Sequence, residues 1–341
     1  MDTAARISAP ESLPASWYGD PALWQQERQR IFAASWSLIA REDQLAEPGT
    51  YVAHEVASWP VFVLRGRDGV LRAFHNVCRH RAAALVPDGA GRCEVLRCRY
   101  HGWVYDQDGR LRKAPDFGAE LALQDHGLFP IRVETWRRLV FVCLDDAAPP
   151  LAAWLGSIDS LSQRYPIERM RLHRDLVMDL PVNWKTYGDN YAEGYHVPTI
   201  HPALNRAIDM ASYEVECDSG EGVQIHLAAA GGGTSGLWLW KFPGLFLNMY
   251  DWGMNIARLE PIDHRRSRLA YWYLFADDDP ANQARRDEMM RWSLTIFEED
   301  RDICADVQRN LDAGVYSTGR LSPVMENGVI QFQDWVRARL R

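Results

Sequence analysis

The sequence lacks a long apolar run, an excess of basic residues and an N-terminal leader, and each shortage excludes a class of protein. No stretch of about 18 apolar residues occurs, so we expect no transmembrane helix. The formal net charge of −8 disfavours a nucleic-acid binder, which normally carries a basic excess. Because the first residues show no basic start followed by an apolar stretch, we expect no secretory signal. The sequence therefore predicts a cytoplasmic protein whose partners include neither a membrane nor a nucleic acid.

Two further shortages concern cofactors and disulfides. The G-x-G-x-x-G fingerprint of a dinucleotide-binding unit is absent, so we expect no nicotinamide cofactor on this chain itself. The 341 residues include six cysteines, and in a reducing compartment these are expected to be thiols or metal ligands rather than disulfides. Three of them, Cys78, Cys93 and Cys98, lie close together in the sequence and are interleaved with histidines.

The remaining composition is that of a globular chain with two domains. Apolar residues make up 47% of the chain, which is enough for two cores of ordinary size. Between about residues 36 and 145, short apolar runs alternate with Gly, Asp and Pro, and Asp68-Gly69 marks a hairpin turn, so we predict a small all-β domain. Pro149 and Pro150 end this pattern. We expect an N-terminal arm and helix packed on the larger domain (1–37), the β domain (38–148) and the larger domain (149–341).

The larger domain is expected to combine an antiparallel sheet with flanking helices, which makes the fold class α+β. The periodicity predicts helices over residues 21–34, 153–164, 183–196 and about 282–311. It predicts strands over Trp238–Leu247, Gly253–Leu259 and Leu269–Phe275. The Gly-rich stretch Ala228–Ser235 is expected to be a flexible loop that could serve as a lid.

The most informative spacing joins Cys78, His80, Cys98 and His101. A Cys-x-His pair is followed after 17 residues by Cys-x-x-His, so two short loops each offer one thiolate and one imidazole. A binuclear iron–sulfur centre uses such a set with two thiolates on one iron and two histidines on the other. A Cys₂His₂ zinc site is the alternative, but zinc motifs usually pair cysteine with cysteine. The pattern favours a [2Fe–2S] cluster and leaves Cys93 as a core thiol.

A second group of candidate ligands lies in the segment NWKTYGDNYAEGYHVPTIHP. Glu193 and His196 are three residues apart, so we expect them on one face of a helix. Pro198 is expected to break that helix, which lets His201 turn towards the same metal. Two histidines with one carboxylate leave open positions for O₂ on Fe(II). This group therefore indicates a mononuclear non-haem iron site.

The carboxylate ligand is expected from the helix near residues 296–311. At roughly 100° per residue, one apolar face gathers Ile296, Phe297, Ile303, Cys304, Val307 and Leu311. Asp300 lies near the middle of that face, and the carboxylates outside it are Glu298, Glu299, Asp302 and Asp306. A lone carboxylate in apolar surroundings is costly unless it is paired or bound to a metal. Asp300 is the candidate third ligand, and the alternatives are a buried salt bridge for Asp300 and ligation by Asp302.

These segments resemble the Rieske-type non-haem iron oxygenases, the ring-hydroxylating family. Within Asn76–Tyr105, CRHR and YHGWVY resemble the family's Rieske domain. NWK, DNY, the two histidines and EEDRDICADVQRNL resemble its catalytic domain, and the resemblance spans about Trp36–Trp335. One departure is Arg99, where many members have Pro, but that position is not a ligand. The resemblance implies a Rieske [2Fe–2S] cluster, mononuclear Fe(II), O₂, and NAD(P)H used indirectly through a separate flavin- or ferredoxin-type reductase.

The resemblance also implies how such a chain would work. Family members are trimers in which each cluster passes electrons to the iron of the neighbouring subunit through an acidic residue, and Glu193 is the matching residue here. Glu at this position is similar to the choline, glycine betaine and carnitine monooxygenase branch, although it is not confined to that branch. Many monooxygenases and demethylases of this family have chains of about this length, so the resemblance implies a homotrimeric monooxygenase that hydroxylates or demethylates a small organic substrate. The alternatives are ring dihydroxylation and a non-enzymatic Rieske electron carrier, and the carrier leaves His196 and His201 without a role.

Aromatic residues of the expected strands are the candidates for a substrate pocket: Trp238, Trp240, Phe246, Tyr250 and Trp252. Aromatic walls bind a quaternary ammonium by cation–π contact and an aromatic ring by stacking. Lys241 and Arg258 would suit a substrate carboxylate, although both are expected at the surface by default. The sequence leaves the substrate open between a quaternary ammonium and an aromatic compound, and it leaves mono- and dioxygenation open as well.

Overall fold

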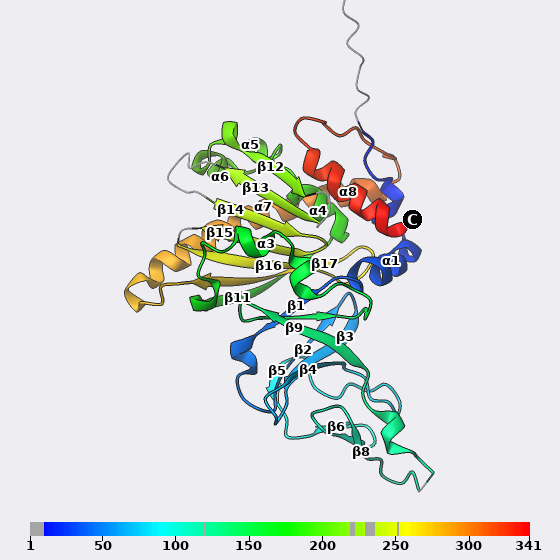
Figure 1. The fold of residues 1–341 in the computed structure, drawn as a ribbon. Helices are drawn as coiled ribbons and strands as arrows, with labels where there is room; N and C mark the ends of the chain where they lie inside the picture. Colours follow the sequence, from blue (N-terminus) through cyan, green and yellow to red (C-terminus); the bar gives the residue numbers. More distant parts are fainter. Residues whose placement is uncertain (1–9, 119, 219–221, 229–235, 251) are drawn as a thin grey trace, which may run out of the picture. The chain divides into compact units, whose positions relative to one another are not determined.

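The chain forms two compact units in the computed structural model, which describes residues 10–118, 120–218, 222–228, 236–250 and 252–341 (Figure 1). The smaller unit is Phe32–Trp154, and the larger unit combines the N-terminal segment up to Ile31 with Leu155–Arg341. The chain therefore leaves the larger unit, builds the smaller one and returns. This division falls a few residues from the boundaries expected at 37 and 148.

The smaller unit is built from β-strands. Its main sheet runs in the order β1 (Ser37–Arg41), β10 (Leu139–Cys143), β9 (Pro130–Trp136), β4 (Leu71–His75), β3 (Trp59–Arg65), β2 (Thr50–Val56), β5 (Gly89–Arg92). A second sheet joins β6 (Leu96–Arg97), β7 (Val104–Tyr105) and β8 (Leu111–Lys113). The expected hairpin is confirmed, because β3 pairs with β4 and Gly69 has a φ of +77° in the turn.

Alternation along β3 gives the smaller unit two cores. Val61 and Val63 belong to one buried cluster, whereas Phe62 and Leu64 belong to another, as expected when successive side chains point to opposite faces of a sheet. The second cluster also contains Cys78 and Cys98. The two thiols therefore lie in a dry core against the main sheet, which is where a buried cofactor needs its ligands.

The larger unit is organised around one antiparallel meander of seven strands. Its order is β11 (Arg171–Leu180), β17 (Ser267–Phe275), β16 (Gly253–Pro261), β15 (Leu245–Tyr250), β14 (Gly236–Lys241), β13 (Val223–Ala228), β12 (Glu214–Asp218). The single strand expected over Trp238–Leu247 is wrong, because β14 and β15 are separate strands that pair with each other. Pro243 lies between them, and proline cannot donate a hydrogen bond to a ladder.

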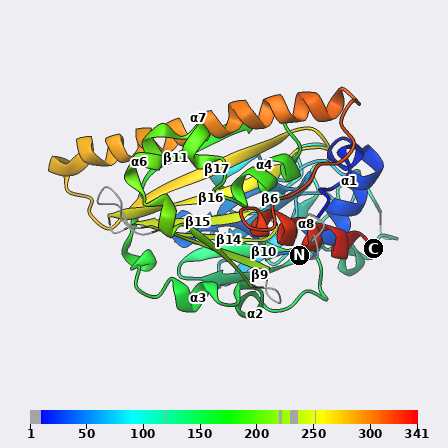
Figure 2. The ribbon, with the colours of Figure 1, turned by 90° about the horizontal axis from the view of Figure 1, so that it is seen from above.

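Helices cover this sheet. The long helix α7 (Gln283–Asp312) confirms the helix expected near 282–311, and Figure 2 shows it beside the yellow strands β16 and β17. The other described helices of the larger unit are α1 (Pro21–Glu27, continued by a π-helix to Phe32), α3 (Ile158–Leu161), α4 (Trp184–Tyr191), α5 (Val197–Ile200), α6 (Pro202–Ala207) and α8 (Asn327–Leu340). Helix α2 (Leu151–Leu155) lies where the chain passes from the smaller unit to the larger one. Among the described residues, no helix combines the length and apolar character needed to cross a bilayer. Of the expected lid, residues 229–235 lie outside the described residues.

A buried ion pair joins the N-terminal helix to α4. The Lys185 ammonium donates to Glu27 Oε1 at 2.5 Å, and the Trp184 indole N–H donates to Glu27 Oε2 at 2.9 Å. Lys185 is 0% and Glu27 is 1% exposed. A charge this deeply buried is tolerated only when it is paired and hydrogen-bonded, so α1 and the start of α4 depend on each other.

Candidate functional site: two clusters of metal-ligating side chains

The smaller unit presents two loops with matching hydrogen bonds. In the first, Cys78 N–H donates to Ala83 O at 2.9 Å and Ala82 N–H donates to Cys78 O at 3.0 Å. In the second, Cys98 N–H donates to Trp103 O at 2.8 Å and Gly102 N–H donates to Cys98 O at 3.0 Å. Ala82 and Gly102 have φ of +57° and +73° at the same step of their loops. Each cysteine therefore begins a tight turn, and the two turns have the same geometry, so the cysteine and the histidine of each loop are held in similar positions.

The four predicted ligands of these loops lie together. The Cys78 and Cys98 thiols are both 2% exposed and adjacent, and the His80 and His101 rings are 4.5 Å apart. Buried His80 Nδ1 has no hydrogen-bond partner among the described residues, although the His80 ring stacks on Trp103 at 5.0 Å. An orphaned ring nitrogen beside two dry thiols is the donor set that a Cys₂His₂ iron–sulfur cluster needs.

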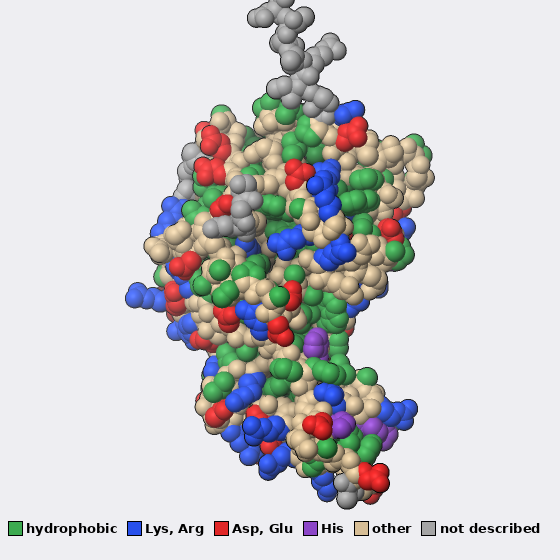
Figure 3. All heavy atoms as spheres, turned by 45° about the vertical axis from the view of Figure 1, so that its right-hand side comes forward, with side chains coloured by type: hydrophobic (Ala, Val, Ile, Leu, Met, Phe, Trp, Pro, Cys, Tyr) green, Lys and Arg blue, Asp and Glu red, His purple; other side chains and the backbone are tan. Residues whose placement is uncertain are grey.

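The two types of ligand differ in exposure. His101 is exposed and His80 is half-buried. Figure 3 shows histidine side chains (purple) at the surface of the smaller unit. The thiols face the core, and Cys78 Sγ lies 3.4 Å from the Tyr105 hydroxyl. Burial raises the pKa of Cys78, so a thiolate at this position needs a metal to compensate its charge. The histidine side of these two loops is therefore the side nearer to solvent.

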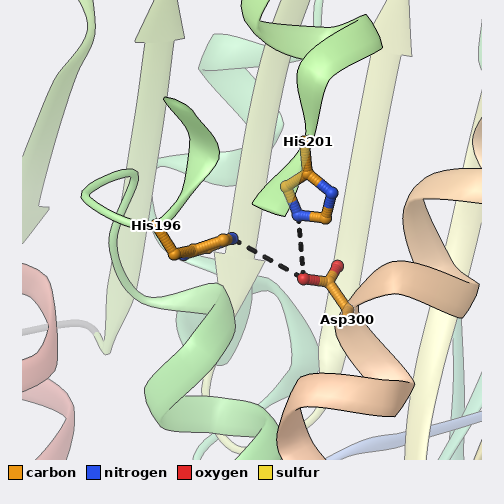
Figure 4. Close-up of side chains that lie close together, drawn as sticks. All are labelled: His196, His201 and Asp300. Carbon is orange, nitrogen blue, oxygen red and sulfur yellow. Dashed lines mark hydrogen bonds and ion pairs between the residues drawn. The ribbon is translucent and has the colours of Figure 1, made fainter. Parts of the chain in front are cut away.

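In the larger unit, His196, His201 and Asp300 converge on one point (Figure 4). Asp300 Oδ1 lies 3.0 Å from His201 Nε2 and 3.6 Å from His196 Nε2. The three ligand atoms lie within 4.8 Å of one another, so one ion can contact all of them. Two imidazoles and one carboxylate are the donor set of a non-haem Fe(II) centre with open positions.

The local path of the chain between the two histidines differs from the expected one. Helix α4 ends at Tyr191, so Glu193 and His196 do not share a helix face. His196 is instead the N-cap of the short helix α5, and Pro198 lies in its first turn, where a missing N–H costs nothing. The expectation that Pro198 breaks a helix is therefore wrong, but the two rings still meet, with centroids 5.1 Å apart.

Each of these histidines has a glutamate on its other ring nitrogen. His196 Nδ1 lies 2.6 Å from Glu193 Oε1, and His201 Nδ1 lies 2.7 Å from Glu299 Oε2. A carboxylate in this place fixes the tautomer and leaves Nε2 free for a metal. Burial opposes a charge on His201, but the bonds to Asp300 and Glu299 outweigh it and raise the His201 pKa. Sequence reasoning missed Glu299, because only the fold brings α7 beside His201.

Asp300 lies on a narrow buried stripe of α7. The stripe runs through Phe297, Asp300, Cys304 and Gln308, and Asp300 is 9% exposed. Asn190 Nδ2 on α4 donates to Asp300 Oδ1 at 2.7 Å and helps to hold this carboxylate. The apolar face is narrower than expected: Val307 is 44% exposed, because only one stripe of α7 packs against the unit.

A pocket opens beside the three convergent side chains. Aromatic and polar side chains form much of its wall, including Tyr187, Tyr191, Tyr213, His226, Trp238, Asn248, Tyr250, Asn255, Tyr271 and Ser293. Aliphatic side chains complete it: Val197, Leu204, Ile208 and Ile296. Every Lys and Arg of the chain except Arg6 belongs to the described residues, and none of them lines this pocket. The wall can therefore bind a cation or a neutral group, but it offers a carboxylate no cationic partner.

The expected pocket residues divide into two sets. Trp238 and Tyr250 line the pocket, with the Trp238 indole N–H donating to the Tyr250 hydroxyl at 2.9 Å. Trp240 and Phe246 do not, because they pack on each other at 5.3 Å beneath α4 and α8. Trp252 is also absent from the described lining and stacks on Tyr250 at 4.7 Å.

The two cationic candidates for a substrate carboxylate also lie elsewhere. Lys241 is 2% exposed and Arg258 forms an ion pair with Glu260 at 3.1 Å. Neither is among the described lining residues, so the structure does not place Lys241 or Arg258 where either could bind a substrate carboxylate in this pocket. Lys241 lies at the end of β14 away from Trp238, and Arg258 is committed to the acid that its own strand supplies.

A buried histidine in the pocket wall was not expected from the sequence. His226 on β13 is 3% exposed, and its Nδ1 lies 2.6 Å from the Tyr213 hydroxyl. Its Nε2 is buried with no hydrogen-bond partner among the described residues. Burial, helped by His196, lowers the pKa of His226 to about 3, so the ring is neutral.

The chain matches two protein-family models. Residues 35–135 match the Rieske [2Fe-2S] domain. Residues 167–237 and 228–341 match the ring hydroxylating alpha subunit, catalytic domain. The first match contains both cysteine–histidine loops and the second contains His196, His201 and Asp300.

Similar proteins cover nearly all of the chain. Choline monooxygenase, chloroplastic, from Spinacia oleracea is 28% identical over 344 residues, which are 96% of this chain and 78% of the relative. The carnitine monooxygenase oxygenase subunit from Acinetobacter pittii is 27% identical over 367 residues, covering 98% of this chain and 96% of the relative.

Solved structures agree with this similarity. The crystal structure of the quaternary ammonium Rieske monooxygenase CntA with L-carnitine superposes with a TM-score of 0.87 at 26% identity, covering 99% of this chain and 97% of that one. Naphthalene 1,2-dioxygenase from Rhodococcus superposes with a TM-score of 0.79 at 20% identity, covering 96% and 94%, and shares the fold.

Proposed function

The chain belongs to the Rieske ring-hydroxylating oxygenase alpha subunits, and from this premise we propose that it uses O₂ to hydroxylate, or oxidatively demethylate, a quaternary ammonium compound. As a member of this family it is an oxygenase with a Rieske cluster and a mononuclear iron. The observation that carries the substrate proposal is the pocket beside His196, His201 and Asp300, whose wall is aromatic and has no described Lys or Arg.

The ligand assignment follows from the two clusters. Cys78 and Cys98 would hold one iron of the [2Fe–2S] cluster, and His80 and His101 would hold the other. His196, His201 and Asp300 would hold the mononuclear iron. When bound, the two centres supply single electrons and open coordination positions for O₂.

The protein's own residues prepare this site before any substrate arrives. Glu193 and Glu299 hold the Nδ1 atoms of His196 and His201, so that both Nε2 atoms face Asp300. Asn190 donates to the same Asp300 oxygen, which keeps that carboxylate from rotating away. Rings that are already oriented lose little freedom when the metal binds.

The aromatic wall suits a methylated ammonium group. Tyr191, Trp238 and Tyr250 line the pocket, and each ring is itself positioned by a hydrogen bond through its polar atom. A quaternary ammonium has no N–H to donate, so cation–π contact and apolar contact are the interactions open to it. The similarity to choline and carnitine monooxygenases supports the same substrate class.

We further propose that the chain works as a homotrimer with a separate NAD(P)H-dependent reductase. Glu193 would connect its own His196 to a cluster histidine of the neighbouring subunit, since it is already bonded to His196 at 2.6 Å. The CntA structure that "reveals insights into carnitine oxidation by gut microbiota and inter-subunit electron transfer" supports this arrangement.

A single-turnover assay tests the substrate class. The protein, loaded with both metals and chemically reduced, is exposed to O₂ with a panel of methylammonium compounds and aromatic acids, and products are read by mass spectrometry. An oxidised or demethylated ammonium product is the expected result. A hydroxylated aromatic product would move the chain to the ring hydroxylases, with the same residues as a stacking slot. Reduction without any product would contradict both.

A further inference from the structure

His226 occupies a defined position on the pocket side of the large sheet. In the strand register, His226 on β13 is opposite Trp238 on β14, Trp238 is opposite Asn248 on β15, and Asn248 is opposite Asn255 on β16. Side chains that are directly opposite each other lie side by side on one face of a sheet. All four residues line the pocket, so this row faces the space beside the iron ligands.

The hydrogen bond to Tyr213 determines which nitrogen of His226 carries the proton. The Tyr213 hydroxyl has no other acceptor among the described residues, so it donates to His226 Nδ1 over the 2.6 Å that separates them. A neutral imidazole that accepts at Nδ1 carries its hydrogen on Nε2. Buried His226 Nε2 therefore presents an N–H with no acceptor in the described part of the chain.

The two asparagines of this row are hydrogen-bonded to each other, and one of them also accepts from Tyr191. The Tyr191 hydroxyl donates to Asn248 Oδ1 at 2.8 Å, and Asn248 Nδ2 donates to Asn255 Oδ1 at 2.8 Å. A buried N–H without an acceptor is destabilising, so His226 is a group whose hydrogen bonding a ligand would complete. No mechanistic step assigned above uses it.

We propose that His226, held by Tyr213, is the specificity residue that donates a hydrogen bond from Nε2 to a neutral oxygen of the substrate, such as a hydroxyl. This rests on the proposed function. It narrows the substrate to a quaternary ammonium with a neutral oxygen, because no Lys or Arg of the described lining offers a carboxylate a charge partner.

The iron-ligand segment holds the Tyr213–His226 pair in place. A side chain at Gly194 would have its Cβ only 2.3 Å from Tyr213 Cε1, so the Tyr213 ring lies directly on the backbone of this glycine. Gly194 lies between Glu193 and His196. The donor in the pocket is thereby positioned from the same short segment that supplies the metal ligand His196.

Two ligands of the same shape test the donor. The fully loaded protein is titrated without O₂ with choline, and with n-propyltrimethylammonium, in which a methyl group replaces the hydroxyl. Wild type is expected to bind choline about tenfold more tightly, the value of one hydrogen bond to a buried donor. It is also expected to bind choline more tightly than γ-butyrobetaine, whose carboxylate finds no cation in the wall.

Variants identify the residue responsible. His226→Phe should bring choline and n-propyltrimethylammonium to within about twofold of each other, because ring volume stays and the donor is lost. Tyr213→Phe should reduce the preference without removing it, because the ring can then place its proton on either nitrogen. Tyr165→Phe is the matched control, since it deletes another buried hydroxyl, bonded to Arg164, and should keep the full preference.

The outcomes separate this inference from the substrate proposal. Equal binding of both ligands by wild type, or an unchanged preference in His226→Phe, would overturn the role of His226 while leaving an ammonium substrate. Tighter binding of γ-butyrobetaine than of choline would overturn the inference that the substrate carries a neutral oxygen rather than a carboxylate. If wild type binds none of the three, both the substrate class and this inference fall.

Discussion

At the scale of single residues, Asp300 has the clearest role to test. Replacing it with Ala should remove the mononuclear iron and turnover but keep the visible absorption of the cluster, because Cys78, His80, Cys98 and His101 belong to the other unit. Iron analysis and absorption spectra measure the two centres separately. Asp302→Ala is the control, since Asp302 is 71% exposed and bonded to Arg301. Retained iron in Asp300→Ala would mean that another residue is the ligand.

Glu299 should matter through His201. Glu299→Gln keeps the shape but weakens the hold on His201 Nδ1, so the affinity for Fe(II) should fall by about 10- to 100-fold. Titration of the iron-free protein with Fe(II) measures this. Glu298→Gln, on the exposed side of α7, should bind iron like wild type. Equal affinities for Fe(II) in Glu299→Gln and Glu298→Gln would show that Glu299 does not hold His201 in place for the metal.

Asp189 predicts a pH dependence of stability. Burial outweighs the hydrogen bonds from Tyr18 and Gln333 and raises the pKa of Asp189 to about 6. The folded state then holds this proton more tightly than the unfolded chain, whose Asp pKa is about 3.9. Its contribution to stability is therefore present at low pH and is lost as the pH rises through about 6.

The comparison for Asp189 is with Asp189→Asn, which does not titrate. Between about pH 4 and pH 7, wild type should lose free energy of unfolding relative to this variant, by no more than about 3 kcal/mol. Denaturant titrations at several pH values measure the difference. A difference that stays constant across this range would show that Asp189 has an ordinary pKa.

Single residues also show where prediction from sequence ends. Asp300 was found because helical phase alone places it among apolar neighbours, and phase is a property of the sequence. The same helical phase places Glu299 outside the apolar face, one residue from the buried stripe, and so predicts no role for it. Only the fold brings Glu299 to His201, which is 98 positions away in the sequence. His226 gave no signal at all, because its environment is created by Tyr213 and by strands that pair only in the fold.

At the scale of elements, the Glu27–Lys185 pair joins α1 to α4. Glu27→Gln leaves the Lys185 charge buried without a counter-ion and should lower the free energy of unfolding by about 3–5 kcal/mol. The double variant Glu27→Gln with Lys185→Met should recover part of this loss, because no charge is then stranded. Denaturant unfolding of the three proteins measures both effects. A loss under about 1 kcal/mol in Glu27→Gln would contradict the coupling.

The elements also differ in how well the sequence predicts them. The β3–β4 hairpin and α7 follow from local signals, a Gly with positive φ and a long apolar period. The sequence pattern does not predict the turn between β14 and β15, because aromatic residues continue the strand alternation across Pro243. The sequence predicts that helix α4 continues to His196, but the helix ends at Tyr191. Beyond its end, Gly194 lies against the Tyr213 ring, where there is no room for a side chain.

At the scale of the whole molecule, the oxygenase and the electron carrier differ in metal content and electron flow. The oxygenase should hold about three irons per chain and the carrier about two. Glu193→Gln should bind Fe(II) more weakly, as Glu299→Gln does, so it is loaded with excess iron. In the fully loaded variant, reoxidation of the reduced cluster by O₂ and substrate should still be slowed by more than about tenfold relative to wild type. Rapid-mixing absorption measures that rate. Normal turnover in this variant would remove the bridging role of Glu193.

The order of the two units along the chain has a consequence for synthesis on the ribosome. The smaller unit is continuous, so its sheet can form as soon as Trp154 has emerged. Glu27 is made early, but its partner Lys185 follows 158 positions later. During that interval Glu27 lacks its charge partner, so the α1 segment is exposed to chaperones and proteases before α4 is made. A nascent chain stalled before α4 should therefore be cut within residues 10–31 while its β unit resists.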